Sequence, residues 1–283
     1  MFGLNKMYIL LFFLISVLIL YFTYAFYINP KNVPEDEYII PKKIFQLIPD
    51  KSKIHPEIQQ TINKIKNLNP DWNYTLYDDT DILNYINTNF PEYLSLYLKI
   101  NPKYGAARAD FFRYLLMYKE GGVYLDIKSS MNKPLKHIIS KNDEYILAHW
   151  TSSPFKQELN NLYGEYQQWH IICKPNHPFL KRTIENVIDN INNYNYNRDG
   201  FGKAGVLKVT GPYVYSKSII PVVNKYNHKL FSDHIYSGLV YNSTKTDHRE
   251  IIGGTHYSKI NEPIVLNENT IEPKKFSNYD YII

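Results

Sequence analysis

The chain has 283 residues, of which 44% are hydrophobic and 21% charged, so it can bury a full core. This composition excludes a disordered chain, a collagen-like repeat and a disulfide-held miniprotein, and the single cysteine, Cys173, excludes an intrachain disulfide and a cysteine-built zinc cage. The net charge of +5 is spread along the chain without a basic tail, so we expect no nucleic-acid partner.

Residues 8–28 form an uncharged apolar segment close to the N-terminus. As a helix rising about 1.5 Å per residue, this segment would span roughly 30 Å, the thickness of the hydrocarbon core of a bilayer. Lys6 precedes the segment and three acidic residues follow it at positions 35–37. The positive-inside tendency therefore predicts a transmembrane signal-anchor with residues 1–7 in the cytosol and the rest of the chain in the lumen or outside the cell.

A cleaved signal peptide is the alternative for the same segment, with Thr23 and Ala25 as the small residues before the cut. The apolar part of a signal peptide usually has only about 7–15 residues, which favours the anchor. After the segment, residues 29–37 contain two prolines and several charges, and we expect a short stalk there. Residues 38–283 then have the size of one α/β domain.

The first part of this domain alternates between strand and helix patterns. A β-rich run at residues 44–48 is followed by a helix that begins at Pro56, carries an apolar stripe and stops at Asn69-Pro70. Residues 72–77 alternate like a half-buried strand, and residues 82–87 predict a helix that the preceding acidic residues can cap. The order strand, helix, strand, helix predicts an α/β fold with a mainly parallel sheet.

The most informative segment runs from residue 105 to residue 128. Residues 106–120 are strong helix formers, Gly121-Gly122 supplies a left-handed stop, and residues 123–127 predict a strand. Asp126 is thereby brought near the end of a strand, where open α/β sheets usually bind their ligands.

Three residues of this segment carry charges that we expect to interact. Asp110 and Arg113 lie three apart on the predicted helix and therefore share one face. Burying the carboxylate of Asp126 in an apolar strand is costly without a cation or hydrogen-bond donors. A structural ion pair of Asp126 with Arg113 or Lys128 would meet this requirement, so the residues alone leave a structural and a functional role open.

The pattern of these motifs resembles the sugar-binding glycosyltransferases of family 32, which contain an Asp-x-Asp motif. The central stretch consists of Ala-Asp-x-x-Arg-Tyr, an apolar helix and Gly-Gly-Val-Tyr-Leu-Asp-Ile-Lys. Further similarity extends over the segments 39–46, 69–77 and 176–180, and the chain is more distantly similar to glucosylating bacterial toxins. The resemblance implies a GT-A type fold, a nucleotide-diphosphate-sugar donor and transfer with retention at the anomeric carbon.

The resemblance also implies roles for individual residues. Asp110 and Arg113 suit the sugar ring of the donor, because a carboxylate accepts hydroxyl hydrogen bonds and a guanidinium donates a fixed fork. Arg108, on the same helix, would meet phosphate or an acidic neighbour. The remaining donor-site positions are Gly122 and the loop residues Gly211 and Pro212, although Gly211-Pro212 is also compatible with a plain turn.

Asp126 is the expected holder of a cation that offsets negative charge on the departing nucleoside diphosphate. The chain departs from the family here, because Lys128 replaces the second carboxylate of the motif. We expect Asp126 to bind Mn²⁺ or Mg²⁺ with other ligands, among them His256, which could equally be a solvated loop histidine. Two alternatives are that Lys128 itself supplies the positive charge without a metal, and that the site is inactive.

Together, these observations predict a membrane-anchored glycosyltransferase that moves a hexose from a UDP- or GDP-sugar to a glycan, glycolipid or protein acceptor. The alternative is a catalytically silent sugar-binding or scaffold protein with the same fold. The three tryptophans could stack on a base or a sugar ring but could as well fill the core, and we assign none of them. Cys173, which follows two isoleucines, is expected to be a small buried residue and not a nucleophile.

Overall fold

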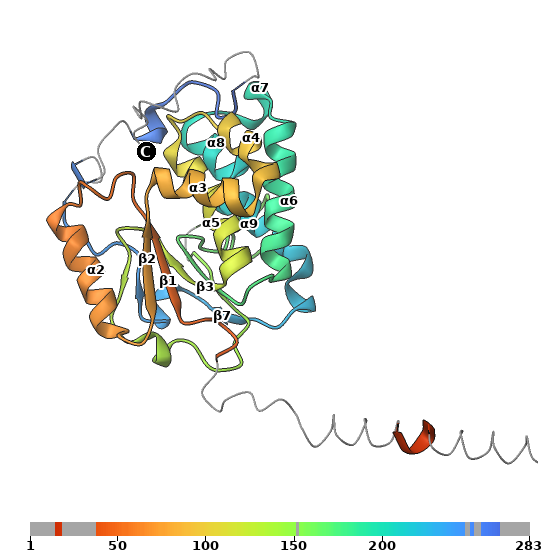
Figure 1. The fold of residues 1–283 in the computed structure, drawn as a ribbon. Helices are drawn as coiled ribbons and strands as arrows, with labels where there is room; N and C mark the ends of the chain where they lie inside the picture. The colour runs from red at the N-terminus through yellow and green to blue at the C-terminus, as the bar shows by residue number, and fades with distance from the viewer. Residues whose placement is uncertain (1–14, 19–37, 151–152, 247–249, 252–255, 267–283) are drawn as a thin grey trace, which may run out of the picture. The chain divides into compact units, whose positions relative to one another are not determined.

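The computed structural model describes residues 15–18, 38–150, 153–246, 250–251 and 256–266 (Figure 1). The chain divides into two units, Met1–Glu37 and Tyr38–Ile283. Within the first unit, residues 15–18 are helical. The expected anchor at residues 8–28 and the stalk at 29–37 otherwise lie outside the described residues, and the helices that are described include none with the length and apolar character to cross a bilayer.

The second unit contains a six-stranded sheet with the order β2-β1-β3-β6-β5-β7. Strand β1 pairs in parallel with β2 and β3, and β5 pairs in parallel with β7, whereas β6 runs antiparallel to both β3 and β5. Two short strands, β4 and β8, form a separate antiparallel pair. The strand bounds are β1 Lys43–Leu47, β2 Asn73–Tyr77, β3 Gly122–Leu125, β4 Ser130–Met131, β5 Tyr145–Ala148, β6 His170–Cys173, β7 Lys229–Phe231 and β8 Leu239–Val240.

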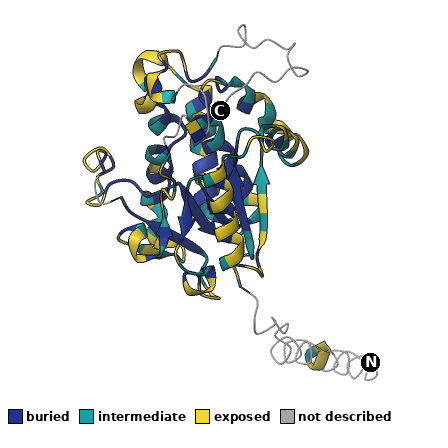
Figure 2. Cartoon of the chain, turned by 90° about the vertical axis from the view of Figure 1, so that its left-hand side faces the viewer, coloured by how far each residue is buried: buried dark blue, intermediate teal, exposed yellow. Residues whose placement is uncertain are grey.

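Helices cover the sheet on two sides, with α2 on one side and α5, α6 and α9 on the other (Figure 1). The α-helices are α2 Pro56–Leu68, α3 Asp79–Asn89, α4 Pro91–Lys99, α5 Gly105–Glu120, α6 Pro178–Asn192, α7 Tyr196–Asp199, α8 Gly202–Val209 and α9 Pro212–Ile219. Short 3₁₀ turns are η1 Leu135–His137, η2 Ile220–Lys225, η3 His234–Tyr236 and η4 Tyr257–Lys259. The inner strands β1, β3, β5 and β6 are largely buried between these layers, whereas the edge strands β2 and β7 are partly exposed and the helices expose their outer faces (Figure 2).

The two faces of the sheet belong to different hydrophobic clusters, because side chains alternate along a strand. Phe45 and Tyr124 contribute to the cluster that contains α5 and α6. Their neighbours Ile44 and Val123 belong to the cluster on the α2 side, together with Ile65 of that helix. Both faces are apolar, as is usual for a sheet that is covered on both sides.

Local sequence signals explain where the first helices begin. In α2, His55 is the N-cap, with its ring nitrogen accepting from the amide of Glu57, and Pro56 occupies the first turn. In α3, Asp78 and Asp81 form a reciprocal capping box, so that the helix begins at Asp79, earlier than the predicted residue 82.

The structure confirms an α/β fold with a mainly parallel sheet and corrects one detail of the expectation, the end of strand β3. The sheet is mixed, because β6 enters it antiparallel after a long excursion that the strand pattern does not encode. Strand β3 ends at Leu125 instead of residue 127, so Asp126 lies just beyond the strand and Lys128 lies in the following turn. The two-residue period of a strand therefore does not apply to Asp126 and Lys128. A mixed sheet between helical layers fits the GT-A type of fold.

Candidate active site at the end of strand β3

Helix α5 brings Asp110 and Arg113 to the central strand. The helix ends at Gly121, whose φ of 61° makes a left-handed stop, and the chain passes directly into β3. Both side chains are buried, with 5% of the Asp110 and 7% of the Arg113 side chain exposed. Arg113 Nη2 lies 3.3 Å from Asp110 Oδ1, which confirms that the two residues share one helical face.

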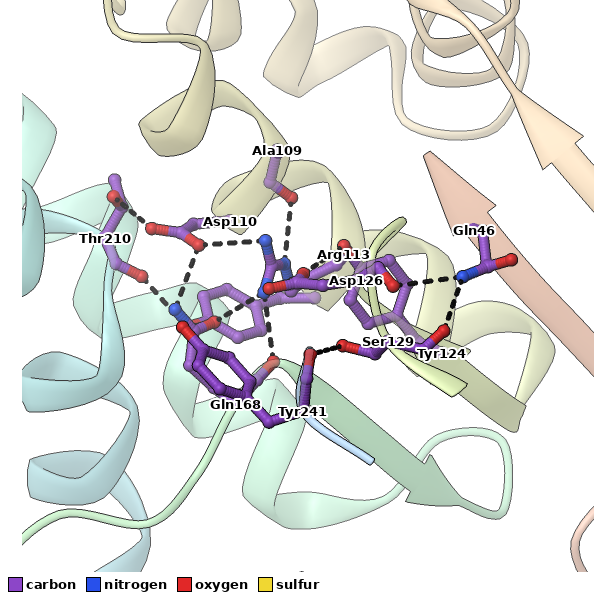
Figure 3. Close-up of polar contacts among 11 residues, drawn as sticks. Gln46, Ala109, Asp110, Arg113, Tyr124, Asp126, Ser129, Gln168, Thr210 and Tyr241 are labelled. Carbon is purple, nitrogen blue, oxygen red and sulfur yellow. Dashed lines mark hydrogen bonds and ion pairs between the residues drawn. The ribbon is translucent and has the colours of Figure 1, made fainter. Parts of the chain in front are cut away.

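Arg113 connects the helix to Asp126 at the end of β3 (Figure 3). Its Nη1 lies 3.1 Å from Asp126 Oδ1 and donates to the carbonyl of Gln168 at 3.0 Å, while its guanidinium lies 4.7 Å from the ring centre of Tyr124. Burial opposes the charge of Arg113, but the carboxylates of Asp126 and Asp110 outweigh it and raise the pKa of the guanidinium above its ordinary value. The structure therefore contains one of the two structural ion pairs considered for Asp126, the pair with Arg113.

Asp110 receives hydrogen bonds on both of its carboxylate oxygens. Gln168 Nε2 donates to Oδ1 and Thr210 Oγ1 donates to Oδ2, each at 3.0 Å (Figure 3). Tyr114 ties these two partners together, because its hydroxyl lies 2.9 Å from both Gln168 Oε1 and the carbonyl oxygen of Thr210. Burial raises the pKa of Asp110 to about 6, against the opposing charge of Arg113 and these hydrogen bonds.

The backbone around Asp126 is held by three distant segments. Its amide donates to the carbonyl of Trp169 at 2.8 Å, and its carbonyl accepts from the buried amide side chain of Gln46 at 3.0 Å. The hydroxyl of Ser129 in turn donates to the carbonyl of Tyr241 at 2.6 Å. Tyr124 donates its hydroxyl to Asp126 Oδ1 at 2.9 Å, yet 36% of the Asp126 side chain remains exposed. Asp126 is thus a fixed carboxylate that can reach a ligand.

These charged groups line a cavity of about 610 Å³, which is within the usual range for small-molecule sites. The cavity also has aromatic and basic walls. The aromatic residues are Tyr124, Trp150, Trp169, Tyr241 and Tyr257, and the basic residues are Lys103, Lys128, Lys203 and His256. Such a mixture of aromatic surface and a few fixed polar groups suits a ligand with rings and anionic groups.

Most of the site residues predicted from the sequence meet in this cavity. Asp110, Arg113, Asp126, Lys128, Pro212 and His256 all line it. Three others do not belong to its lining. Arg108 donates to the carbonyl of Ile100 and lies over the ring of Tyr97. Gly122 packs against backbone, and a β-carbon there would lie 2.7 Å from Lys43 O. Gly211 does the same, and a β-carbon there would lie 2.8 Å from Leu207 Cα.

Sequence reasoning did not identify several residues of the site. Gln168 and Thr210 hold the Asp110–Arg113 pair, but they come from segments 58 and 100 residues further along the chain, and no spacing rule connects such positions. Tyr124 could have been found, because strand alternation directs it to the same side as α5. Trp150 and Trp169, which were considered and left unassigned, both line the cavity.

The described residues do not fit a metal site built by the protein alone. They contain no group of three or more histidine, cysteine, aspartate or glutamate side chains that could hold a metal ion. Asp126 Oδ1 already faces Arg113 and Tyr124, and Nδ1 of His256 lies 2.7 Å from the hydroxyl of Ser258. A divalent ion at Asp126 would need most of its oxygen ligands from elsewhere. The metal expectation stays a prediction.

Comparison with known proteins identifies the region that carries this site. Residues 56–145 match the family described as "Glycosyltransferase sugar-binding region containing DXD motif". The chain is 26% identical over 217 residues to the initiation-specific alpha-1,6-mannosyltransferase of Schizosaccharomyces pombe, covering 68% of this chain and 53% of that protein. It is 28% identical over 159 residues to inositol phosphoceramide mannosyltransferase 1 of the same yeast, covering 55% of this chain and 45% of that protein. The chain thus spans about half the length of these relatives.

The solved structures that the chain matches include the PaToxG glycosyltransferase, at a TM-score of 0.45 and 20% identity over 66% of this chain and 72% of that one. The ligand-free glycosyltransferase domain of the YGT toxin matches at a TM-score of 0.45 and 9% identity, over 69% of this chain and 80% of that one.

The matched region begins with α2 and contains Asp110, Arg113, Asp126 and Lys128, so it includes the charged core of the cavity. The family model and the mannosyltransferase relatives confirm the resemblance that the motifs predicted. These findings support a glycosyltransferase family 32-like protein, and the matched residues 56–145 carry Asp-x-Lys in place of the DXD motif.

Proposed function

We propose that the protein is a glycosyltransferase that moves a hexose from a nucleotide-diphosphate sugar to a hydroxyl of a glycan, glycolipid or protein acceptor, with retention at the anomeric carbon. The observation that carries the proposal is the convergence of Asp110, Arg113 and Asp126 in one cavity. The mannosyltransferase names of the relatives favour GDP-mannose as the first donor to test.

The donor's sugar ring is assigned to the buried pair of Asp110 and Arg113. An ionised carboxylate accepts hydrogen bonds from two sugar hydroxyls, and the guanidinium fixes its orientation. Gln168 and Thr210 keep the carboxylate in place through their own donors, so binding a sugar requires little rearrangement there.

The diphosphate is assigned to the end of the cavity where Asp126 leads into the turn with Lys128. Departure of the nucleoside diphosphate builds negative charge, and a fixed positive group nearby lowers the energy of that state. Lys128 lines the cavity, and the backbone carbonyl of this turn residue accepts from the amide of Ser243 at 2.8 Å. The Lys128 ammonium therefore supplies the offsetting charge in this proposal.

Residues 8–28 are proposed to anchor the protein in a membrane, with the catalytic unit in the lumen or outside the cell. The support is the length and uncharged composition of this segment and the acidic residues that follow it.

The proposal is tested by measuring hydrolysis of a panel of UDP- and GDP-sugars by the full chain, with EDTA and with added Mn²⁺. We expect one nucleotide sugar to be hydrolysed, and we expect Arg113→Ala to abolish the reaction because it leaves two carboxylates without their cation. Turnover that persists in EDTA would support the role of the Lys128 ammonium in offsetting the charge of the diphosphate. Turnover that is lost in EDTA and recovered with Mn²⁺ would support a metal at Asp126.

Circular dichroism of Arg113→Ala provides the folding control. Nucleotide sugars that raise the melting temperature of the wild type without being turned over would favour the alternative of a catalytically silent sugar-binding protein. Wild-type hydrolysis by a folded Arg113→Ala protein would remove the assigned role of this residue.

A further inference from the structure

A third carboxylate, Glu165, lies in the wall of the same cavity and belongs to none of the contacts described above. It is only 6% exposed. Its backbone is fixed, because its amide donates to the hydroxyl of Ser153 at 3.2 Å and its carbonyl accepts from the amide of Trp150 at 3.3 Å. Glu165 is therefore held in the cavity wall by the main chain and not by its own carboxylate.

The carboxylate of Glu165 has an unmet hydrogen-bonding requirement. Its Oε2 is shielded from solvent and has no hydrogen-bond partner among the residues that the structure describes. Burial raises the pKa of this group, and only its own backbone amide opposes the rise. Asp110 in the same cavity differs, because partners satisfy both of its oxygens. Buried polar groups nearly always have a partner, so the carboxylate of Glu165 is disposed to accept a hydrogen bond from a donor in the cavity.

The charges of the cavity restrict what that ligand can be. An anionic group would be repelled by the carboxylate of Glu165. A cationic group would face Lys103, Lys128 and Lys203, which also line the cavity. Uncharged hydroxyl groups are repelled neither by Glu165 nor by the lysines. They can donate hydrogen bonds to an ionised carboxylate, which acts only as an acceptor. Trp150 lines the cavity as well and offers an aromatic surface to the apolar face of a sugar ring.

We propose that Glu165 is an acceptor-binding residue that accepts hydrogen bonds from the hydroxyl groups of an uncharged sugar acceptor. This inference rests on the proposed glycosyltransferase function and adds the acceptor class to it. The donor is held by Asp110 and Arg113, and the acceptor by Glu165.

The test compares Glu165→Gln with Glu158→Gln, a matched change on the same loop. Glu158 is half exposed, pairs with Lys208 at 3.5 Å and is not part of the cavity lining. Three probes are titrated into the full chain: methyl α-mannoside, methyl β-galactoside and methyl β-N-acetylglucosaminide. Binding is read from tryptophan fluorescence, because Trp150 and Trp169 line the cavity. Donor hydrolysis, transfer to the bound glycoside and the melting temperature are measured on the same samples.

We expect at least one glycoside to bind to the wild type and Glu165→Gln to weaken it about tenfold, since a hydrogen bond to a charged group is lost. The KM for the glycoside should rise by a similar factor, and this rise should exceed any change in donor hydrolysis by water. The melting temperature should not fall, because the variant removes a buried carboxylate that has no partner. Glu158→Gln should behave like the wild type.

Several results would overturn the inference. One is a wild type that binds none of the three glycosides, and another is an unchanged KM for the glycoside in Glu165→Gln. A third is a Glu165→Gln protein in which donor hydrolysis and the melting temperature fall together, which would make Glu165 a structural residue. Failure of the proposed function itself is distinguishable, because it appears as a wild type that hydrolyses no nucleotide sugar, before any Glu165 variant is compared.

Discussion

Asp110 is a carboxylate under opposing influences. Burial favours its neutral form, whereas Arg113, Gln168 and Thr210 favour the charged form, and the balance leaves its pKa raised to about 6. A protonated Asp110 accepts fewer hydrogen bonds from a sugar than the ionised group does. The charge state of this one residue should therefore control donor binding within the neutral to mildly acidic range.

The affinity for the nucleotide sugar should fall as the pH drops below about 6, and Asp110→Asn should abolish this dependence. Stability should change in the opposite sense. The pKa is raised in the folded state, so the folded protein binds this proton more readily than the unfolded chain, and the contribution of Asp110 to the free energy of unfolding rises as the pH falls from about 6 to about 4. Isothermal titration with the donor at a series of pH values measures the inflection.

Thr210→Val is the matched variant for this prediction. The Thr210 hydroxyl donates to Asp110 Oδ2 and thereby lowers the pKa of Asp110. Because the variant removes this hydroxyl, the inflection should move to higher pH. A wild-type affinity that stays constant between pH 7 and 5 would contradict the account.

The junction between α5 and β3 is the element that aligns the site. The helix carries Asp110 and Arg113, the strand leads to Asp126, and Gly121 and Gly122 make the turn between them, with φ angles of 61° and 97°. A β-carbon on Gly121 would lie 2.6 Å from Pro175 Cδ and 2.9 Å from Cys173 O. The turn therefore needs glycine for its conformation and for the space.

Gly121→Ala should lower the free energy of unfolding by about 3 kcal/mol, because left-handed strain and a steric clash act together. The control is Gly200→Ala in the turn after α7, where φ is 78° but the nearest atom lies at 3.9 Å. That variant should lose only the strain, about 1 kcal/mol. Urea unfolding measures both values, and equal losses would show that the close approach to residues 173 and 175 has no energetic effect.

The elements of this junction could be predicted from the sequence, because helix propensity, a Gly-Gly stop and an apolar run are all local signals. The same signals led to the Asp110–Arg113 contact through the spacing of three residues. They did not show that β3 ends at Leu125, since Ile127 continues the apolar pattern while the backbone of Asp126 is held by Gln46 and Trp169. The strand passes into a turn in which the amide of Ser129 donates to the carbonyl of Asp126 at 2.8 Å, and the apolar pattern of the strand does not indicate this turn.

At the scale of the whole molecule, the cavity is assembled from segments far apart in the chain. Its walls come from the end of β1, from α5, from the loop before β6, from α8 and from the residues after β8. The antiparallel β6 is what brings Gln168 and Trp169 beside Asp126. The alternating pattern of strands and helices predicted a mainly parallel sheet and did not place this antiparallel strand. The partners of the charged pair, and the unpartnered Glu165, follow from this long-range topology.

The central claim is that the buried Asp110–Arg113 pair binds the sugar of the donor. It is tested most directly by comparing the affinities of the wild type and Asp110→Asn for a nucleotide sugar and for its nucleoside diphosphate, starting with GDP-mannose and GDP. In the wild type the sugar should strengthen binding about tenfold or more, whereas in Asp110→Asn the two ligands should bind almost equally and GDP should keep its wild-type affinity. An unchanged preference for the nucleotide sugar in Asp110→Asn would contradict the account.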